Sequence, residues 1–129
     1  MPLVRLEVRQ GRSATQKQAL LDAAHAALVE TLGVPDHDRM QRILEHPCED
    51  FELPLGSGDD FVLVEVTMFP ARSRQAKRRL YQGLVRNFGK LGVAPADVFV
   101  VLHEPPMDNW GIRGGQMASE VDLGFEVQV

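Results

Sequence analysis

The sequence is poor in several features that would each point to a particular class of protein. It has one cysteine, Cys48, so no disulfide can form within the chain. No apolar run approaches the length of a signal-peptide core or a membrane span. No basic run carries interleaved aromatics, and the net charge is −4, unlike a nucleic-acid-binding protein. His37, His46 and His103 lack the paired spacing of a metal site. We therefore expect a cytoplasmic domain with no metal or cofactor, and with neither nucleic acid nor membrane as a partner.

What remains is the composition of a globular protein. Apolar residues make up 44% of the chain and charged residues 25%, which is enough apolar material for a packed core. A length of 129 residues suits one domain and is short for two.

Three short segments of the first half recur, in the same order, about sixty residues later. The pairs are Val4-Arg5-Leu6-Glu7-Val8 with Val62-Leu63-Val64-Glu65-Val66, Arg12-Ser13 with Arg72-Ser73, and Leu32-Gly33-Val34 with Leu91-Gly92-Val93. The shared order and nearly constant spacing indicate an internal duplication.

Within the first copy the apolar period changes from strand-like to helix-like and back. Residues 3–8 alternate as a half-buried strand does, and Ser13 can cap the helix that follows. Gly33 and Pro35 supply the helix stop, and residues 40–46 return as a strand. The helix stripe expected to be buried consists of Leu21, Ala24, Leu28 and Leu32.

The second copy follows the same plan. Residues 61–69 form the predicted strand, Ser73 the cap, Gly92 and Pro95 the stop, and residues 98–103 the returning strand. The predicted buried stripe consists of Leu80, Leu84, Phe88 and Leu91.

These elements predict one α/β (α+β) domain over residues 1–129. A β-α-β crossover makes its strands parallel, so two such units give a four-stranded mixed sheet with both helices on one face. The predicted parts are repeat one at about 2–47, a linker at 48–60, repeat two at about 61–104 and a tail at 105–129. The other sheet face would be bare and apolar, so we expect a homo-oligomer. The alternating stretch 121–129 could add an edge strand to a neighbouring subunit.

Two residues stand out as candidates for chemistry. Pro2 directly follows the initiator, so removal of Met1 would leave a secondary amine whose pKa burial or a nearby cation could lower toward neutrality. Alternatively, Pro2 merely starts a strand. Arg72 lies where the second strand meets its helix, a place that favours anionic ligands, and a guanidinium can hold a carboxylate through two hydrogen bonds.

Other polar and aromatic residues have a structural and a functional interpretation. Asp38 and Asp97 hold matching places just before the returning strands, and for Asp97 we favour a structural role. His25 is expected on the helix surface or at an interface. Trp110 begins a glycine-rich loop and is either a packing anchor or the apolar wall of a pocket.

Taken together, the Met-Pro start, the duplicated β-α-β unit and the arginine opening the second helix resemble the tautomerase superfamily. Segments such as Gly33-Val34-Pro35, Ala96-Asp97-Val98 and Asn109-Trp110-Gly111 are similar to its malonate semialdehyde decarboxylase-like branch. The resemblance implies a homotrimer with active sites near the subunit contacts. Its implied site residues are Pro2 as the catalytic amine, Arg72 as the carboxylate binder, Asp38 as the water-activating carboxylate, and Trp110 and Ile112 in the apolar wall.

Three functions follow from this reading. The first is keto-enol tautomerisation of a small oxo-carboxylate, with Arg72 holding the carboxylate and Pro2 moving a proton between carbon and oxygen. The second is decarboxylation of a 3-oxo acid such as malonate semialdehyde, with Asp38 handling water or proton transfer. The third is a non-catalytic trimeric protein that binds a carboxylate or interacts with other proteins.

Overall fold

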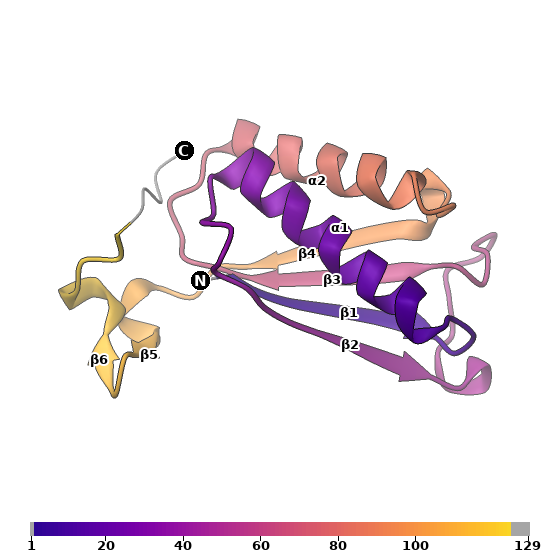
Figure 1. Ribbon diagram of the computed structural model, residues 1–129, viewed down its shortest axis with the longest axis horizontal. Coiled ribbons are helices and arrows are strands. Elements are labelled where there is room, and N and C mark those ends of the chain that lie inside the picture. The colour runs from indigo at the N-terminus through magenta and orange to yellow at the C-terminus, as the bar shows by residue number, and fades with distance from the viewer. Residues whose placement is uncertain (1, 125–129) are drawn as a thin grey trace.

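The computed structural model describes residues 2–124 as a four-stranded sheet under two long helices (Figure 1). The elements are β1 (Leu3–Arg9), α1 (Ala14–Leu32), β2 (Met40–His46), β3 (Val62–Thr67), α2 (Arg74–Gly89) and β4 (Val98–His103). The strand order is β2-β1-β3-β4, in which β1 and β2 are parallel, β3 and β4 are parallel, and β1 and β3 are antiparallel. The predicted mixed sheet of two β-α-β units is confirmed.

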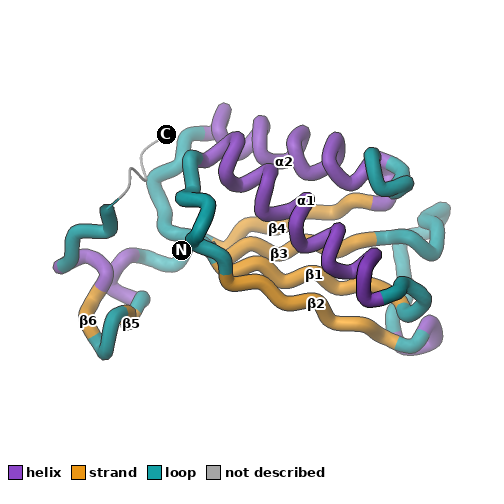
Figure 2. The backbone as a smooth tube through the Cα atoms, in the orientation of Figure 1, coloured by secondary structure: helices purple, strands orange, loops and turns teal. Residues whose placement is uncertain are grey.

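Both helices lie on one face of the sheet, as expected (Figure 2). Each begins at its predicted cap, because the hydroxyls of Ser13 and Ser73 accept hydrogen bonds from backbone N–H groups of the first turn. The first helix also has a full capping box, since the Gln16 side chain accepts from the backbone N–H of Ser13 at 2.8 Å. Gly33 ends this helix in the left-handed conformation, with φ 68°.

The core lies between the helices and the sheet and corrects two details of the predicted stripes. On α1, Leu20 is fully buried, whereas Leu21 is only partly buried. Leu91 is 45% exposed because it follows the end of α2, and Val93 fills the core in its place. The strands contribute alternate residues to this core: Val4, Leu6 and Val8 from β1, and Val62, Val64 and Val66 from β3.

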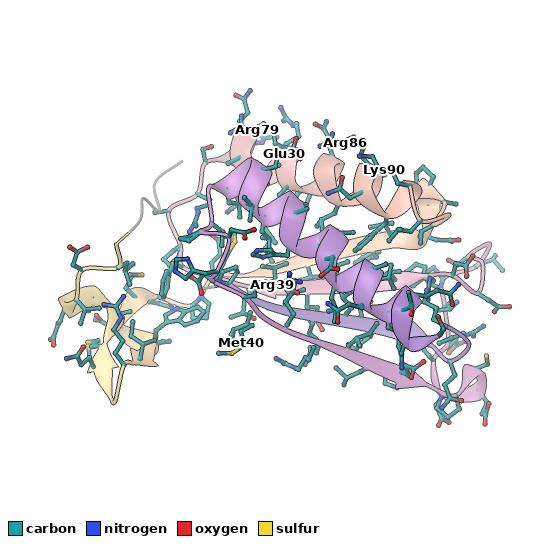
Figure 3. All side chains as sticks on the ribbon, in the orientation of Figure 1. Glu30, Arg39, Met40, Arg79, Arg86 and Lys90 are labelled. Carbon is teal, nitrogen blue, oxygen red and sulfur yellow. The ribbon has the colours of Figure 1, made fainter. Side chains whose placement is uncertain are left out.

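The opposite sheet face is not the bare apolar surface that was expected. Charged side chains cross it, because Arg5 bonds Glu65 across β1 and β3. His46 pairs with Glu7 at 3.0 Å and His103 with Glu65 at 2.9 Å. Apolar side chains still share this face, among them Phe99 at 54% exposed and Met40, which points away from the helices in Figure 3. The face is therefore mixed, with an ion-pair network across its centre.

The solvent-exposed side of α2, by contrast, is strongly basic. Arg79, Arg86 and Lys90 lie along α2 and its C-cap (Figure 3), and α2 contains no acidic residue. Arg86 reaches Glu30 of α1 at 3.3 Å. No helix in the described part of the chain is long and apolar enough to cross a membrane.

The segment after β4 departs from the sequence-based expectation. It forms a small hairpin of β5 (Gly111–Ile112) and β6 (Gln116–Met117), set apart from the main sheet (Figure 1). The edge strand that the alternating stretch 121–129 could add to a neighbouring subunit stays a prediction: within this chain residues 121–124 form no strand, and residues 125–129 lie outside the described residues.

Candidate active site

One end of the sheet collects most of the predicted site residues. β1 and β2 begin at this end, whereas β3 and β4 finish there. Pro2 is buried and directly precedes Leu3, which pairs with Met40 on one side and Thr67 on the other. The register therefore places Pro2 beside the chain that enters β2 and the chain that leaves β3.

Arg72 lies on the chain that leaves β3 and is almost fully buried, with 8% of its surface exposed. Its Nη1 donates to the carbonyl oxygen of Phe69 at 3.3 Å. Its Nε is buried without a hydrogen-bond partner among the described residues. The residue before it, Ala71, has φ 86°, a left-handed conformation that costs energy for any residue except glycine and that clusters at functional sites.

Burial lowers the pKa of Arg72 from its ordinary value, while the carboxylate of Glu104 opposes this shift. Glu104 itself pairs with Lys77, whose Nζ is 2.6 Å from Oε1. A guanidinium still remains cationic at neutral pH, and a buried cation with an unmatched N–H is costly unless an anion joins it. Arg72 is therefore a buried cation with one unmatched N–H donor among the described residues.

A cavity of about 350 Å³ adjoins this region. Asp38 and His37 line it from the turn before β2, Phe69 from the end of β3, and Ile112 from the hairpin. Its remaining lining residues are Pro35, Arg113, Leu123 and Gly124. The cavity thus combines a carboxylate, an imidazole and the guanidinium of Arg113 with an apolar wall, and binding sites for small molecules commonly pair such groups.

Trp110 stands behind this wall. Its ring meets that of Phe69 edge to face at 4.7 Å between centroids, and its Nε1 donates to the carbonyl oxygen of Pro105 at 3.1 Å. Trp110 is buried, and the surface that faces the cavity belongs to Phe69 and Ile112. It therefore supports the wall, whereas Ile112 forms part of it.

Neither Pro2 nor Arg72 lines the cavity within the described chain. Phe69 connects the two regions, because its carbonyl binds Arg72 and it is one of the residues that line the cavity. Leu3, the neighbour of Pro2, packs against the cluster formed by Phe69 and Trp110. The structure therefore brings Pro2, Arg72 and Asp38 to one end of the sheet, with Phe69 between the arginine and the cavity.

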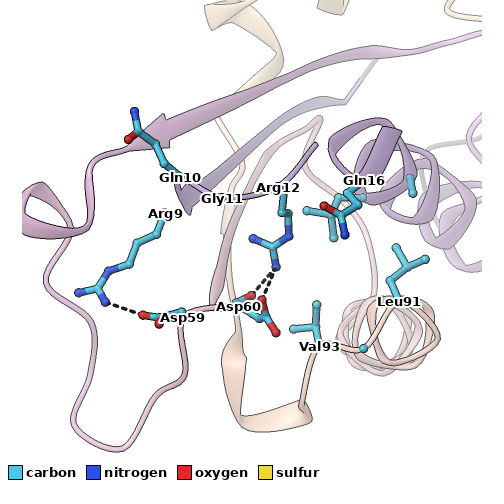
Figure 4. Close-up of a pocket in the computed structure, with 12 residues that line it drawn as sticks. Arg9, Gln10, Gly11, Arg12, Gln16, Asp59, Asp60, Leu91 and Val93 are labelled. Atoms are coloured by element: carbon cyan, nitrogen blue, oxygen red, sulfur yellow. Dashed lines mark hydrogen bonds and ion pairs between the residues drawn. The ribbon is translucent and has the colours of Figure 1, made fainter. Parts of the chain in front are cut away.

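The opposite end of the sheet holds the matching part of the duplication (Figure 4). Val4 and Val62 hold equivalent positions in the two repeats. Pro2 and Asp60, which lie two residues before them, are therefore equivalent as well. Arg12, the counterpart of Arg72, donates to the carbonyl oxygen of Asp60 at 2.7 Å. Arg72 itself donates to the carbonyl oxygen of Phe69, so the two equivalent arginines hold different segments. A cavity of about 380 Å³ lies at this opposite end, where Arg9 and Arg12 are each paired with an aspartate.

Asp97 and His25, which the sequence analysis also considered, both make hydrogen bonds to backbone groups. The carboxylate of Asp97 accepts from the backbone N–H of Gly58 at 3.1 Å, so it ties the segment before β3 to the start of β4, as favoured. His25 was expected on the helix surface or at an interface; it is 4% exposed within the chain, and its Nε2 contacts the carbonyl oxygen of Asp36 at 2.8 Å. The loop that enters β2 folds back over α1 and covers it.

Sequence reasoning missed the roles of Phe69 and Leu123 in the cavity. Phe69 could have been suspected, because it extends the apolar run of β3 up to Pro70, where a strand must end. Leu123 has no comparable signal. In the described part of the chain, no group of three or more His, Cys, Asp or Glu side chains is placed to hold a metal ion.

Comparison with known proteins gives a consistent picture. Two tautomerase family profiles, each described as "Tautomerase enzyme", match residues 38–113 and residues 2–53. The probable tautomerase YrdN of Bacillus subtilis (strain 168) is 31% identical over 122 residues, which cover 90% of this chain and 94% of that protein. The probable tautomerase YusQ of the same organism is 28% identical, covering 90% of this chain and 96% of its own.

Solved structures agree with these relatives. A malonate semialdehyde decarboxylase superposes with a TM-score of 0.82 at 34% identity, covering 89% of this chain and 93% of its own. A fused 4-oxalocrotonate tautomerase, described as a symmetric trimer, has a TM-score of 0.80 at 28% identity, covering 91% and 96% of the two chains. The chain therefore belongs to the tautomerase superfamily, close to the branch that includes malonate semialdehyde decarboxylase.

Proposed function

We propose that this protein is a tautomerase that interconverts the keto and enol forms of a small oxo-carboxylate. Arg72 binds the substrate carboxylate, and Pro2, with Met1 removed, is the acid-base group. Asp38 acts in the adjoining cavity, and Ile112, supported by Trp110, belongs to its apolar wall. The related proteins are named as tautomerases and a decarboxylase, which supports the general class of enzyme.

The observation that carries this proposal is the state of Arg72. A buried guanidinium whose Nε has no partner among the described residues is an unmet donor in a region of low polarity. A carboxylate that accepted two hydrogen bonds from Nε and a terminal nitrogen would satisfy it in a bidentate arrangement. Arg78, in contrast, is exposed on α2 and offers no such enclosed donor.

In this proposal the proton is transferred by the Pro2 amine, which lies at the end of the sheet where the chain carrying Arg72 leaves β3. An α-amino group has an ordinary pKa of about 7.7–8.0, so part of the free Pro2 amine is neutral near pH 7 and available as a base. The neutral amine takes the proton from the carbon next to the substrate carbonyl, and the electron pair moves to the carbonyl oxygen. The protonated amine then gives that proton to the oxygen, which completes the enol and restores the neutral amine. In the reverse direction the same nitrogen returns the proton to carbon.

Decarboxylation of a 3-oxo acid is a second candidate, favoured by Asp38 in the cavity and by the likeness to malonate semialdehyde decarboxylase. The protonated Pro2 amine would polarise the 3-oxo group, or the neutral amine would form an iminium with it and release water. The C–C bond to the carboxylate then breaks, its electron pair moves toward the polarised group, and CO₂ leaves. Asp38 would activate the water or supply the final proton.

The proposed working form is a homotrimer in the cytoplasm. A trimer would bring the mixed sheet face, including the exposed Phe99, into contact with other subunits. A fused 4-oxalocrotonate tautomerase of the same fold is a trimer, which supports this assembly. The cytoplasmic location is a prediction from the single, exposed Cys48.

The test is a panel of enolisable oxo-carboxylates and 3-oxo acids, given to protein whose mass shows that it begins at Pro2. We expect turnover of at least one oxo-carboxylate, with proton exchange at the carbon next to its carbonyl. As a second probe, 3-bromopropiolate, which inhibits a related decarboxylase, should add mass to the peptide that contains Pro2. Binding of carboxylates without turnover or labelling would instead favour a non-catalytic carboxylate-binding protein.

A further inference from the structure

A buried histidine contacts the turn that carries Asp38. We infer that His25 is a positioning residue for Asp38, because its Nε2–H holds the carbonyl of Asp36 and thereby fixes the turn from which Asp38 enters the cavity. This inference rests on the role proposed above for Asp38. It assigns a function to a residue that touches neither the cavity nor Arg72.

The hydrogen bond itself defines the state of the histidine. His25 lies on α1 and its Nε2 is 2.8 Å from the carbonyl oxygen of Asp36. A carbonyl oxygen can only accept, so Nε2 carries the proton. The carboxylate of Asp36 is farther from the same nitrogen, at 3.6 Å, and its side chain is 97% exposed. The backbone carbonyl is therefore the partner that matters.

The bonded carbonyl belongs to the central peptide group of a turn. The turn runs from Pro35 to Asp38 and is closed by the backbone N–H of Asp38, which donates to the carbonyl oxygen of Pro35 at 3.0 Å. Asp36 and His37 are its central residues. The peptide between two central residues is the group that turns over when a type I turn converts to type II. His25 holds that peptide by its oxygen.

A second hydrogen bond fixes the loop to α1 on the other side of Asp38. Arg39 donates from Nη2 to the carboxylate of Asp22 at 2.8 Å. This hydrogen bond, followed by one from Gln18, lowers the pKa of Asp22 below its ordinary value. Asp22 and His25 are one helical turn apart and so lie on the same side of α1. Helix α1 therefore holds the loop by hydrogen bonds on both sides of Asp38.

The consequence for Asp38 is geometric. Its carboxylate enters the cavity from the closing position of the turn, so rotation of the central peptide would displace it relative to Phe69 and Ile112. A displacement of about 1 Å in a catalytic group can cost as much as 100-fold in rate. With His25 removed, the turn would sample more than one arrangement, and the fraction in the productive one would fall. This lowers kcat more than it raises KM, since Arg72 still binds the carboxylate.

Three variants test this inference. His25→Phe keeps an aromatic ring but has no donor, whereas the amide nitrogen of His25→Gln can reach the Asp36 carbonyl. The matched control is Asn87→Leu, which removes a comparable bond from α2, its Nδ2 to the carbonyl oxygen of Ala23 at 3.2 Å. Steady-state kinetics on the best substrate of the panel, melting temperature and amide hydrogen exchange are measured for each.

We expect His25→Phe to lose about tenfold in kcat with less than a threefold change in KM. The amides of Asp38 and Arg39 should exchange faster in it, while that of Met68, which follows β3 and donates to the carbonyl oxygen of His103, keeps its protection. His25→Gln should recover most of the rate and the protection. Asn87→Leu should lower the melting temperature similarly with kcat retained.

Several results would overturn the inference. They are unchanged exchange at Asp38 and Arg39 in His25→Phe, a normal kcat despite faster exchange, or a His25→Gln variant as impaired as His25→Phe. The exchange measurement needs no substrate, so it is separate from the proposed function. A panel without any turnover would contradict the proposed function, whereas unchanged exchange would contradict the role of His25.

Discussion

The guanidinium of Arg72 donates through Nη1 to the carbonyl oxygen of Phe69, 3.3 Å away, which ties the proposed carboxylate binder to a residue of the cavity wall. This bond leaves Nε buried and available. Because the arginine is held by its own chain, it is in place before a ligand arrives and loses little freedom on binding one.

The first prediction compares two arginines of the same segment. Arg72→Ala should weaken carboxylate binding by at least about tenfold, the cost of losing a charge-assisted bidentate contact. Arg78→Ala, on the exposed side of α2, should change it little. Calorimetric titration with a non-reactive carboxylate measures both. Equal losses would indicate diffuse electrostatic attraction without a specific contact.

The second prediction concerns the backbone before Arg72. Ala71 has φ 86°, so Ala71→Gly removes left-handed strain and should raise the free energy of unfolding by about 0.5–1 kcal/mol, after the entropy of glycine is subtracted. Ala26→Gly, at an exposed position inside α1, should lower it by about 1 kcal/mol. Urea unfolding distinguishes them, and losses of equal size would show that Ala71 is unstrained.

The third prediction is a pH dependence of stability centred on Glu65. Its hydrogen bond from Arg5, and then that from His103, lowers the pKa of the Glu65 carboxyl below its ordinary value. A lowered pKa in the folded protein stabilises it above the unfolded pKa, and the effect is lost as the pH falls through the folded pKa. Glu65→Gln should therefore be less stable than the wild type at pH 7 and approach it below about pH 4.

The control for this experiment is Glu52→Gln, because Glu52 is exposed. Its stability should follow that of the wild type at every pH. A constant difference between wild type and Glu65→Gln across the pH range would mean that the change acts through packing and that the ionisation of Glu65 does not matter.

The fourth prediction concerns assembly. Light scattering should give a particle of three times the 14.4 kDa mass of one chain. Phe99→Glu, on the sheet face opposite the helices, should weaken the trimer because it adds a charge to the contact. Leu55→Glu changes an apolar residue that is even more exposed, in the segment between the repeats, and should leave the trimer intact. A stable monomer of the wild-type protein at micromolar concentration would contradict the prediction.

The sequence predicted the regular elements well because each repeat changes its apolar period at the right places. The strands over 40–46 and 98–103 were predicted with their observed ends, and both serine caps were found. The strand predicted over 61–69 is shorter, since Phe61, Met68 and Phe69 are buried for reasons other than sheet pairing. Inside a strand the buried residues follow the apolar period of the sequence. Beyond the ends of the strand, residues can be buried without pairing in the sheet.

The irregular parts could not be predicted from local pattern. His25 is buried because a loop eleven residues later folds over it, and Leu91 is exposed because the helix ends just before it. The candidate site depends on the same kind of information: Asp38, Phe69 and Ile112 are far apart in the sequence, and only the fold brings them to one cavity. The resemblance to a known family pointed to Asp38 and Ile112, but no local signal identified Phe69.

The central claim is that Pro2 acts through a free secondary amine. The most direct measurement compares turnover of the same oxo-carboxylate by protein that begins at Pro2 and by protein with one extra residue before it. The extra residue converts the Pro2 nitrogen to an amide, which is not basic and cannot attack a carbonyl. We expect both proteins to fold, to form trimers and to bind carboxylates through Arg72, with turnover at least ~100-fold lower in the blocked one. Equal turnover by the two proteins would contradict the mechanism and leave Pro2 with a structural role alone.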